Sequence, residues 1–114
     1  MTIQLFLDLN NLDYYGDIPE VPNDPKGRVE ELSFIMDDED LFSEDISGIN
    51  FACNSLLDIG DVDFFNPEQC ESLMRWIEGR IEKPIDARYK EILDALYSFA
   101  QRAIELKTGI VVEL

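Results

Sequence analysis

The fold is decided by residues 66–109, which read NPEQCESLMRWIEGRIEKPIDARYKEILDALYSFAQRAIELKTG. Apolar residues recur in this stretch every three or four positions, which is the spacing of one face of an α-helix. Pro84 interrupts the pattern, and a proline inside a helix breaks its hydrogen bonding. The stretch therefore predicts two amphipathic helices in the C-terminal half of the chain.

The first predicted helix begins after Asn66, whose side chain can cap the helix. Pro67 suits the first helical position, and Gln69 stands three residues after the cap, as in a capping box. The apolar face comprises Cys70, Leu73, Met74, Ile77 and Ile81, with Trp76 beside it. We expect this helix to end near Lys83, because Pro84 follows.

The second predicted helix starts near Asp86. Its apolar face comprises Tyr89, Ile92, Leu93, Leu96, Phe99, Ala100, Ala103 and Ile104. Lys107 in the last turn complements the helix dipole, and Gly109 is a natural C-terminal cap. The apolar residues 110–112 then predict a short terminal strand.

The N-terminal half is less regular. Residues 2–9 alternate between apolar and other side chains, which predicts a strand that is buried on most of both faces. Residues 29–36 fit a strand or a helical face, and the strand is favoured. Residues 10–28 are rich in Gly, Pro and Asn and predict a long loop, whereas residues 46–59 fit a helix or a strand.

Together these elements predict a single domain over residues 1–114. The expected fold class is α+β, with a small, mainly antiparallel sheet and two amphipathic C-terminal helices packed on one face. A chain of 114 residues is long enough to bury a core of its own.

The formal net charge of −16 is the feature furthest from ordinary composition. Residues 1–66 hold sixteen acidic and two basic residues, a net charge of −14, whereas residues 67–114 are nearly balanced at −2. Such charge repels nucleic acids and anionic lipids and attracts basic proteins. We therefore expect a basic protein partner and no binding to nucleic acid or membrane.

The residue types needed for common catalytic sites are scarce. The chain has no histidine, and its two cysteines, Cys53 and Cys70, fit buried, reduced thiols. The N-terminus lacks the features of a secretory signal, and no apolar run approaches the length of a membrane span. We expect a cytoplasmic protein that is not an enzyme and has no catalytic residues, no metal site and no cofactor.

Two acidic clusters remain as candidates for metal chemistry. In residues 37–45, a calcium-binding loop would need a glycine where Ser43 or Asp45 stands, so that motif fails. Asp58, Asp61 and Asp63 surround Gly60, and their carboxylates leave a metal-dependent enzyme open as a minor alternative.

Acidic residues near aromatic ones instead favour a protein interface, in which apolar anchors are surrounded by charge. The candidate partner-binding residues are Asp13, Tyr14, Tyr15, Asp17, Asp37, Asp38, Glu39, Asp40, Glu44, Asp45, Asp58, Asp61 and Asp63.

Residues 57–65, LDIGDVDFF, followed by NPEQC at 66–70 and by Leu73, Trp76 and Ile77, resemble the small acidic immunity proteins of bacterial contact-dependent growth inhibition and polymorphic toxin systems. The resemblance implies a cytoplasmic protein that binds and neutralises a toxin, often a nuclease with a basic cleft. The alternative is a nucleic-acid mimic that inhibits a DNA-binding or defence nuclease, with carboxylates in place of phosphates.

Overall fold

The two ends of the chain lie side by side at the centre of an antiparallel sheet. The computed structural model describes the backbone of residues 1–114 and all side chains except those of Met36 and Asp37. Strands β1 (Thr2–Phe6) and β6 (Gly109–Glu113) pair with each other, while β4 (Val29–Ser33) lies outside β1 and β5 (Val62–Phe65) lies outside β6. The predicted N-terminal and terminal strands are thus confirmed as neighbours in a mainly antiparallel sheet.

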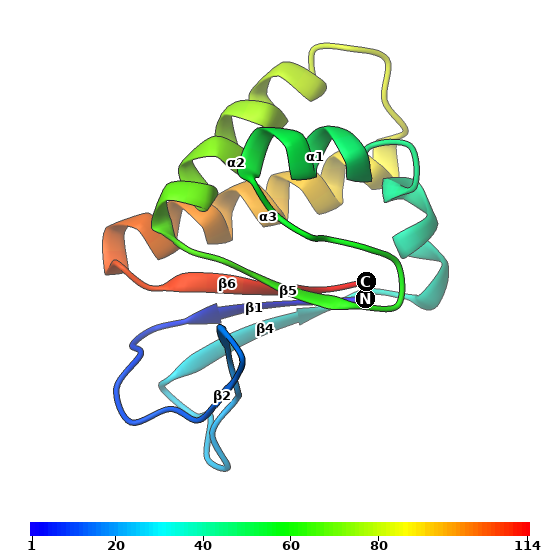
Figure 1. Cartoon of the computed structure of the whole chain (residues 1–114). Coiled ribbons are helices and arrows are strands. Elements are labelled where there is room, and N and C mark those ends of the chain that lie inside the picture. The colour runs from blue at the N-terminus through cyan, green and yellow to red at the C-terminus, as the bar shows by residue number, and fades with distance from the viewer.

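Two long helices cover one face of this sheet (Figure 1). Helix α2 (Pro67–Arg80) starts at a capping box, in which Asn66 and Gln69 exchange hydrogen bonds of 2.9 and 3.0 Å between side chain and backbone. Helix α3 (Ala87–Leu106) starts at Asp86, whose carboxylate accepts from the backbone N–H groups of Arg88 and Tyr89. The predicted α+β fold with two amphipathic C-terminal helices on one sheet face is confirmed.

The ends of both helices differ slightly from prediction. Helix α2 ends at Arg80, three residues before the predicted Lys83. The residue that caps α3 is Lys107, with a left-handed φ of 58°, so the prediction of Gly109 as the cap is wrong. Gly109 is instead the first residue of β6, directly beside the ring of Phe64.

Two further elements connect β4 to β5. A 3-10 helix, η1 (Met36–Phe42), follows the sheet edge, and helix α1 (Ile46–Cys53) then packs against α2. The region 46–59 is therefore a helix followed by a loop, and its sequence pattern alone did not distinguish a helix from a strand. β5, by contrast, is a strand that the sequence pattern does not predict.

The predicted loop 10–28 contains a small hairpin of β2 (Tyr14–Tyr15) and β3 (Ile18–Pro19). It lies on the sheet face opposite the helices (Figure 1), with β3 against β5. Phe6 and Val111 point to this second face, because their strand neighbours point towards the helices, yet both are buried. The central strands are therefore buried on both faces, as predicted for residues 2–9.

Arg28 ties the two ends of the hairpin loop together. Its guanidinium lies 2.6 Å from the carboxylate of Asp8 and also bonds the backbone oxygen of Asn10. This ion pair lowers the pKa of the Asp8 carboxyl. The hairpin is thus held at its base, while its tip points into solvent.

Candidate partner-binding surface

The basic residues of the C-terminal half lie on or beside α2 and α3, where acids neutralise most of them. Arg75 pairs with Glu71 at 2.6 Å and Lys90 with Asp94 at 3.0 Å, each one helical turn apart. Arg102 of α3 reaches Glu30 on the neighbouring sheet edge. The helical layer is therefore close to electrically balanced, as its sequence predicted.

Asp38, one of the candidate binding residues, serves an internal role instead. It is only 3% exposed, and its two carboxylate oxygens accept from the Arg88 guanidinium at 2.8 and 3.1 Å. The hydrogen bonds from Arg88 lower the pKa of the Asp38 carboxyl below its usual value. This two-point ion pair joins η1 to the start of α3 and leaves Asp38 unavailable to a partner.

Asp45 is used in a similar way. Its carboxylate accepts from Arg80 at 3.0 Å and from the hydroxyl of Tyr89 at 2.7 Å. Burial, followed by this hydrogen bond, raises the pKa of the Tyr89 hydroxyl, which keeps the phenol protonated. Asp45 therefore connects α1 to both long helices, and we leave it and Asp38 out of the proposed contact surface.

The other acidic residues of segment 37–45 differ in their exposure to solvent. Asp40 and Glu44 are exposed and Glu39 is half-buried, while the side chain of Asp37 lies outside the described residues. Asp38 and Asp45 are the paired carboxylates of this segment, and both face the helical layer. Among the described residues, no ion pair joins this segment to the hairpin.

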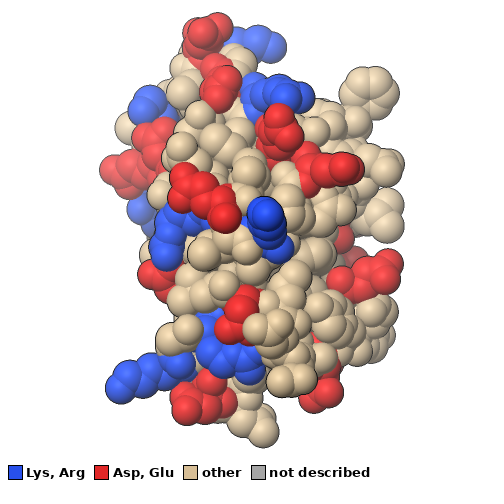
Figure 2. Space-filling view, turned by 90° about the vertical axis from the view of Figure 1, so that its left-hand side faces the viewer, with Lys and Arg blue, Asp and Glu red and all other residues tan. Residues whose placement is uncertain are grey.

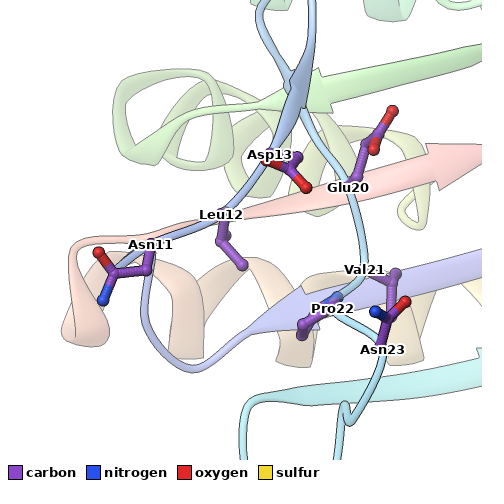
Figure 3. Close-up of a pocket in the computed structure, with 7 residues that line it drawn as sticks. All are labelled: Asn11, Leu12, Asp13, Glu20, Val21, Pro22 and Asn23. Atoms are coloured by element: carbon purple, nitrogen blue, oxygen red, sulfur yellow. The ribbon is translucent and has the colours of Figure 1, made fainter.

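The candidates at 13–17 form the exposed tip of the β2–β3 hairpin. Asp13, Tyr14, Tyr15 and Asp17 are all exposed, and Tyr15 retains 77% of its accessible surface. Gly16, at a φ of 62°, allows the tight turn between the two strands. Figure 3 shows the neck of the hairpin, where the segments carrying Asp13 and Glu20 run side by side, joined by a backbone hydrogen bond of 2.8 Å.

The candidates Asp58 and Asp61 lie in the loop that leads into β5, and Asp63 is the second residue of that strand. The carboxylates of Asp58 and Asp61 each accept from the next backbone N–H at 2.8 Å, and Gly60 turns the chain at a φ of 79°. Asp63 accepts from the N–H groups of Leu56 and Phe64 at 2.8 and 2.9 Å. Within the described part of the chain, no group of three or more His, Cys, Asp or Glu side chains is placed to hold a metal ion.

The hairpin tip and the β5 segment meet around one hollow of about 350 Å³. We call it the hairpin hollow. Its lining residues come from the hairpin, the loop after α1, β5 and the start of α2: Asp17, Ile18, Asn54, Ser55, Leu56, Asp63, Phe64, Asn66 and Gln69. The structure therefore brings together two of the three acidic segments, 13–17 and 58–63.

Two exposed apolar residues, Phe51 of α1 and Leu56 of the hollow lining, are absent from the predicted binding set. Phe51 retains 93% and Leu56 retains 83% of its accessible surface. The signal for Phe51 is visible once α1 is known to be a helix. Ile49 and Cys53, four residues apart, are buried on one face, and Phe51 between them must point the other way.

We call the hairpin tip (residues 13–18), the exposed side chain of Phe51, the loop 54–61 and Asp63 the front surface. Figure 2 shows the molecule from the left-hand side of Figure 1. The front of Figure 1, where α1 and β5 lie, therefore forms the right-hand margin of Figure 2. Blue Lys and Arg side chains lie in the centre and on the left, whereas this margin shows only tan and red atoms (Figure 2). The front surface is therefore acidic and partly apolar.

The two thiols lie in the core, away from this surface. Both cysteines are free and buried, as predicted. Burial raises the pKa of Cys53 to about 11 and that of Cys70 to about 12. Both thiols are therefore protonated at neutral pH, and a protonated thiol is a poor nucleophile.

The chain matches no protein-family model, no curated protein and no solved structure. Across the described residues, no helix is long and apolar enough to cross a membrane.

Proposed function

We propose that the protein is an inhibitor that binds and neutralises a basic protein domain, in the manner of an immunity protein acting on a bacterial toxin nuclease. The observation that carries the proposal is the front surface. It combines exposed carboxylates with exposed apolar and aromatic side chains, while the cations of the C-terminal half lie on the helical layer.

Charge and apolar area have separate roles in such an interface. Carboxylates such as Asp13, Asp17 and Asp58 attract a basic partner and raise the rate of encounter. Buried aromatic and apolar anchors supply most of the affinity, and Tyr15, Phe51 and Leu56 are exposed in a position to do so. Phe51 and Leu56 are the two most exposed large apolar side chains among the described residues, and a need for solubility alone does not account for them.

The same mixture favours a protein-specific inhibitor over a nucleic-acid mimic. A mimic presents carboxylates in place of phosphates, and its binding depends mainly on charge. Phe51 and Leu56 have no counterpart in a phosphate backbone. We expect binding to be selective for one partner and to survive moderate salt, because part of the affinity comes from apolar contact.

Co-expression with the product of the neighbouring gene tests this proposal. Immunity proteins act on a cognate toxin, so the expected result is a stable complex and loss of the toxic or nuclease activity of the partner. Basic nucleases from unrelated sources are the control and should stay active at the same concentration. Inhibition of all of them would identify a nucleic-acid mimic instead, and a neighbour that neither binds nor is inhibited would refute the proposal.

A further inference from the structure

The hairpin hollow is lined by three apolar residues, two acidic residues and four uncharged polar residues. Ile18, Leu56 and Phe64 line it, and Leu56 is largely exposed. Asp17 from the hairpin and Asp63 from β5 are its two acidic residues. No lysine or arginine is among the described residues that line it.

The polar groups of the hollow are largely held in place. Asp63 is fixed by the N–H groups of Leu56 and Phe64, and Gln69 donates to the backbone oxygen of Asn54 at 3.1 Å. A carboxylate can accept about four hydrogen bonds, so Asp63 retains acceptor capacity after these two. Among the described side chains, Asp17 has no cation within ion-pair distance. Its carboxylate is therefore open to an external donor.

We propose that this hollow receives one arginine side chain of the partner. The methylene stem would pack on Leu56 and Ile18, and the guanidinium would lie between the carboxylates of Asp17 and Asp63. Arginine fits better than lysine, because its planar group donates in a fork to carboxylates and also stacks on an aromatic ring such as that of Phe64. The identity of the partner rests on the proposed function, whereas the chemistry of the hollow does not.

A second copy of this chain is a poor occupant. Each copy carries a net charge of −16, so two front surfaces repel each other. The arginines of the helical layer are already paired, as Arg75, Arg80, Arg88 and Arg102 show. A hollow with two acidic residues, three apolar residues and no cation among its described lining residues is complementary to a basic side chain of a different protein.

A partner-independent test uses a small probe. N-acetyl-arginine methylamide is titrated into isotopically labelled protein, and backbone amide shifts are followed by NMR. N-acetyl-citrulline methylamide, which has nearly the same shape without the charge, is the control. We expect saturable shifts concentrated at Ile18, Leu56 and Phe64 with the arginine probe only.

The variant Asp17→Asn should weaken binding of this probe by about threefold to tenfold. The matched change Glu20→Gln removes the same charge from the base of the same hairpin, outside both the hollow and the front surface, and it should leave the affinity nearly unchanged. Equal shifts with citrulline, shifts spread over all exposed carboxylates, or equal effects of the two variants would overturn the inference. Shifts at the hollow that depend on protein concentration without probe would also overturn it, because they would show a second copy as the occupant.

The complex with the neighbouring gene product separates the two proposals. If that partner binds, Asp17→Asn and Leu56→Ala should each weaken the complex by about fivefold or more, with Glu20→Gln well below them. A partner that binds equally well to all three variants would refute the hollow and keep the inhibitor function. Arginine binding to the hollow without any binding of the neighbour would refute the inhibitor function and keep the hollow.

Discussion

Single residues decide which of the many carboxylates are structural and which are free to bind. Asp38 and Asp45 stand in an acidic segment, yet each is held by an arginine from a long helix. Asp17 stands in an equally acidic segment and faces solvent. The sequence could not distinguish these cases, because the arginines that pair with Asp38 and Asp45 lie 50 and 35 residues away along the chain.

The pH dependence of stability should report the Asp38–Arg88 pair. The pKa of Asp38 is lower in the folded protein than its ordinary value of 3.8, so the pair stabilises the fold above that pH. The stabilisation is lost as the pH falls through the lower, folded-state pKa. We expect Asp38→Asn to lower the thermal midpoint by on the order of 5 °C at neutral pH.

The gap between the wild-type protein and Asp38→Asn should narrow once the pH is well below 3.8. Asp94→Asn, which removes an exposed helical carboxylate, is the control and should cause little change at either pH. Thermal melts followed by circular dichroism measure both effects. A gap that stays constant as the pH falls would show that the Asp38 charge does not contribute.

At the scale of elements, Gly109 determines how β5 and β6 meet. A Cβ atom at this position would overlap the ring of Phe64 and lie 2.6 Å from the backbone oxygen of Phe65. We expect Gly109→Ala to reduce the free energy of unfolding by about 2 kcal/mol, because the ring or the strand must move. Urea denaturation followed by fluorescence measures this change.

Gly79 provides the matched control for the same substitution. It lies in the last turn of α2, and a Cβ atom there would meet no atom within 4 Å. Alanine has the higher helix propensity, so Gly79→Ala should raise the stability by about 0.5 kcal/mol. If Gly109→Ala and Gly79→Ala changed the free energy of unfolding by the same amount and in the same direction, the close approach of Phe64 to Gly109 would be contradicted.

The elements also show how much of the fold and site the sequence could predict. Helices α2 and α3 carry local signals, namely their caps and a sustained helical period, and both were predicted. Helix α1 was ambiguous because buried Ile49 and exposed Phe51 are both apolar, which blurs the period. The hairpin strands have two residues each, too few for any period, so the hollow that they complete could not be predicted.

At the scale of the whole molecule, the uneven charge along the chain becomes an uneven charge in space. The balanced C-terminal half supplies the helical layer, whereas the hairpin and the β5 loop of the acidic half supply the front surface (Figure 1). The third acidic segment, 37–45, directs its paired carboxylates towards the helices instead. In that segment Asp38 and Asp45 are paired with arginines, whereas Asp40 and Glu44 remain exposed.

The central claim is that a basic partner binds the front surface, and two triple variants of equal net charge test it most directly. One carries Asn at the front positions Asp13, Asp17 and Asp58. The other carries Gln or Asn at the helical-layer positions Glu82, Asp94 and Glu105. Each variant has a net charge of −13, because three acids are removed from −16.

The measurement is the affinity of each variant for the co-expressed partner, by titration calorimetry with association rates from surface plasmon resonance. The front variant should bind at least about thirtyfold more weakly, mostly through slower association, because three complementary charges are lost. The helical-layer variant should stay within about threefold of the wild-type protein. Equal loss in both variants would show that the partner responds to net charge alone, and it would contradict a binding site on the front surface.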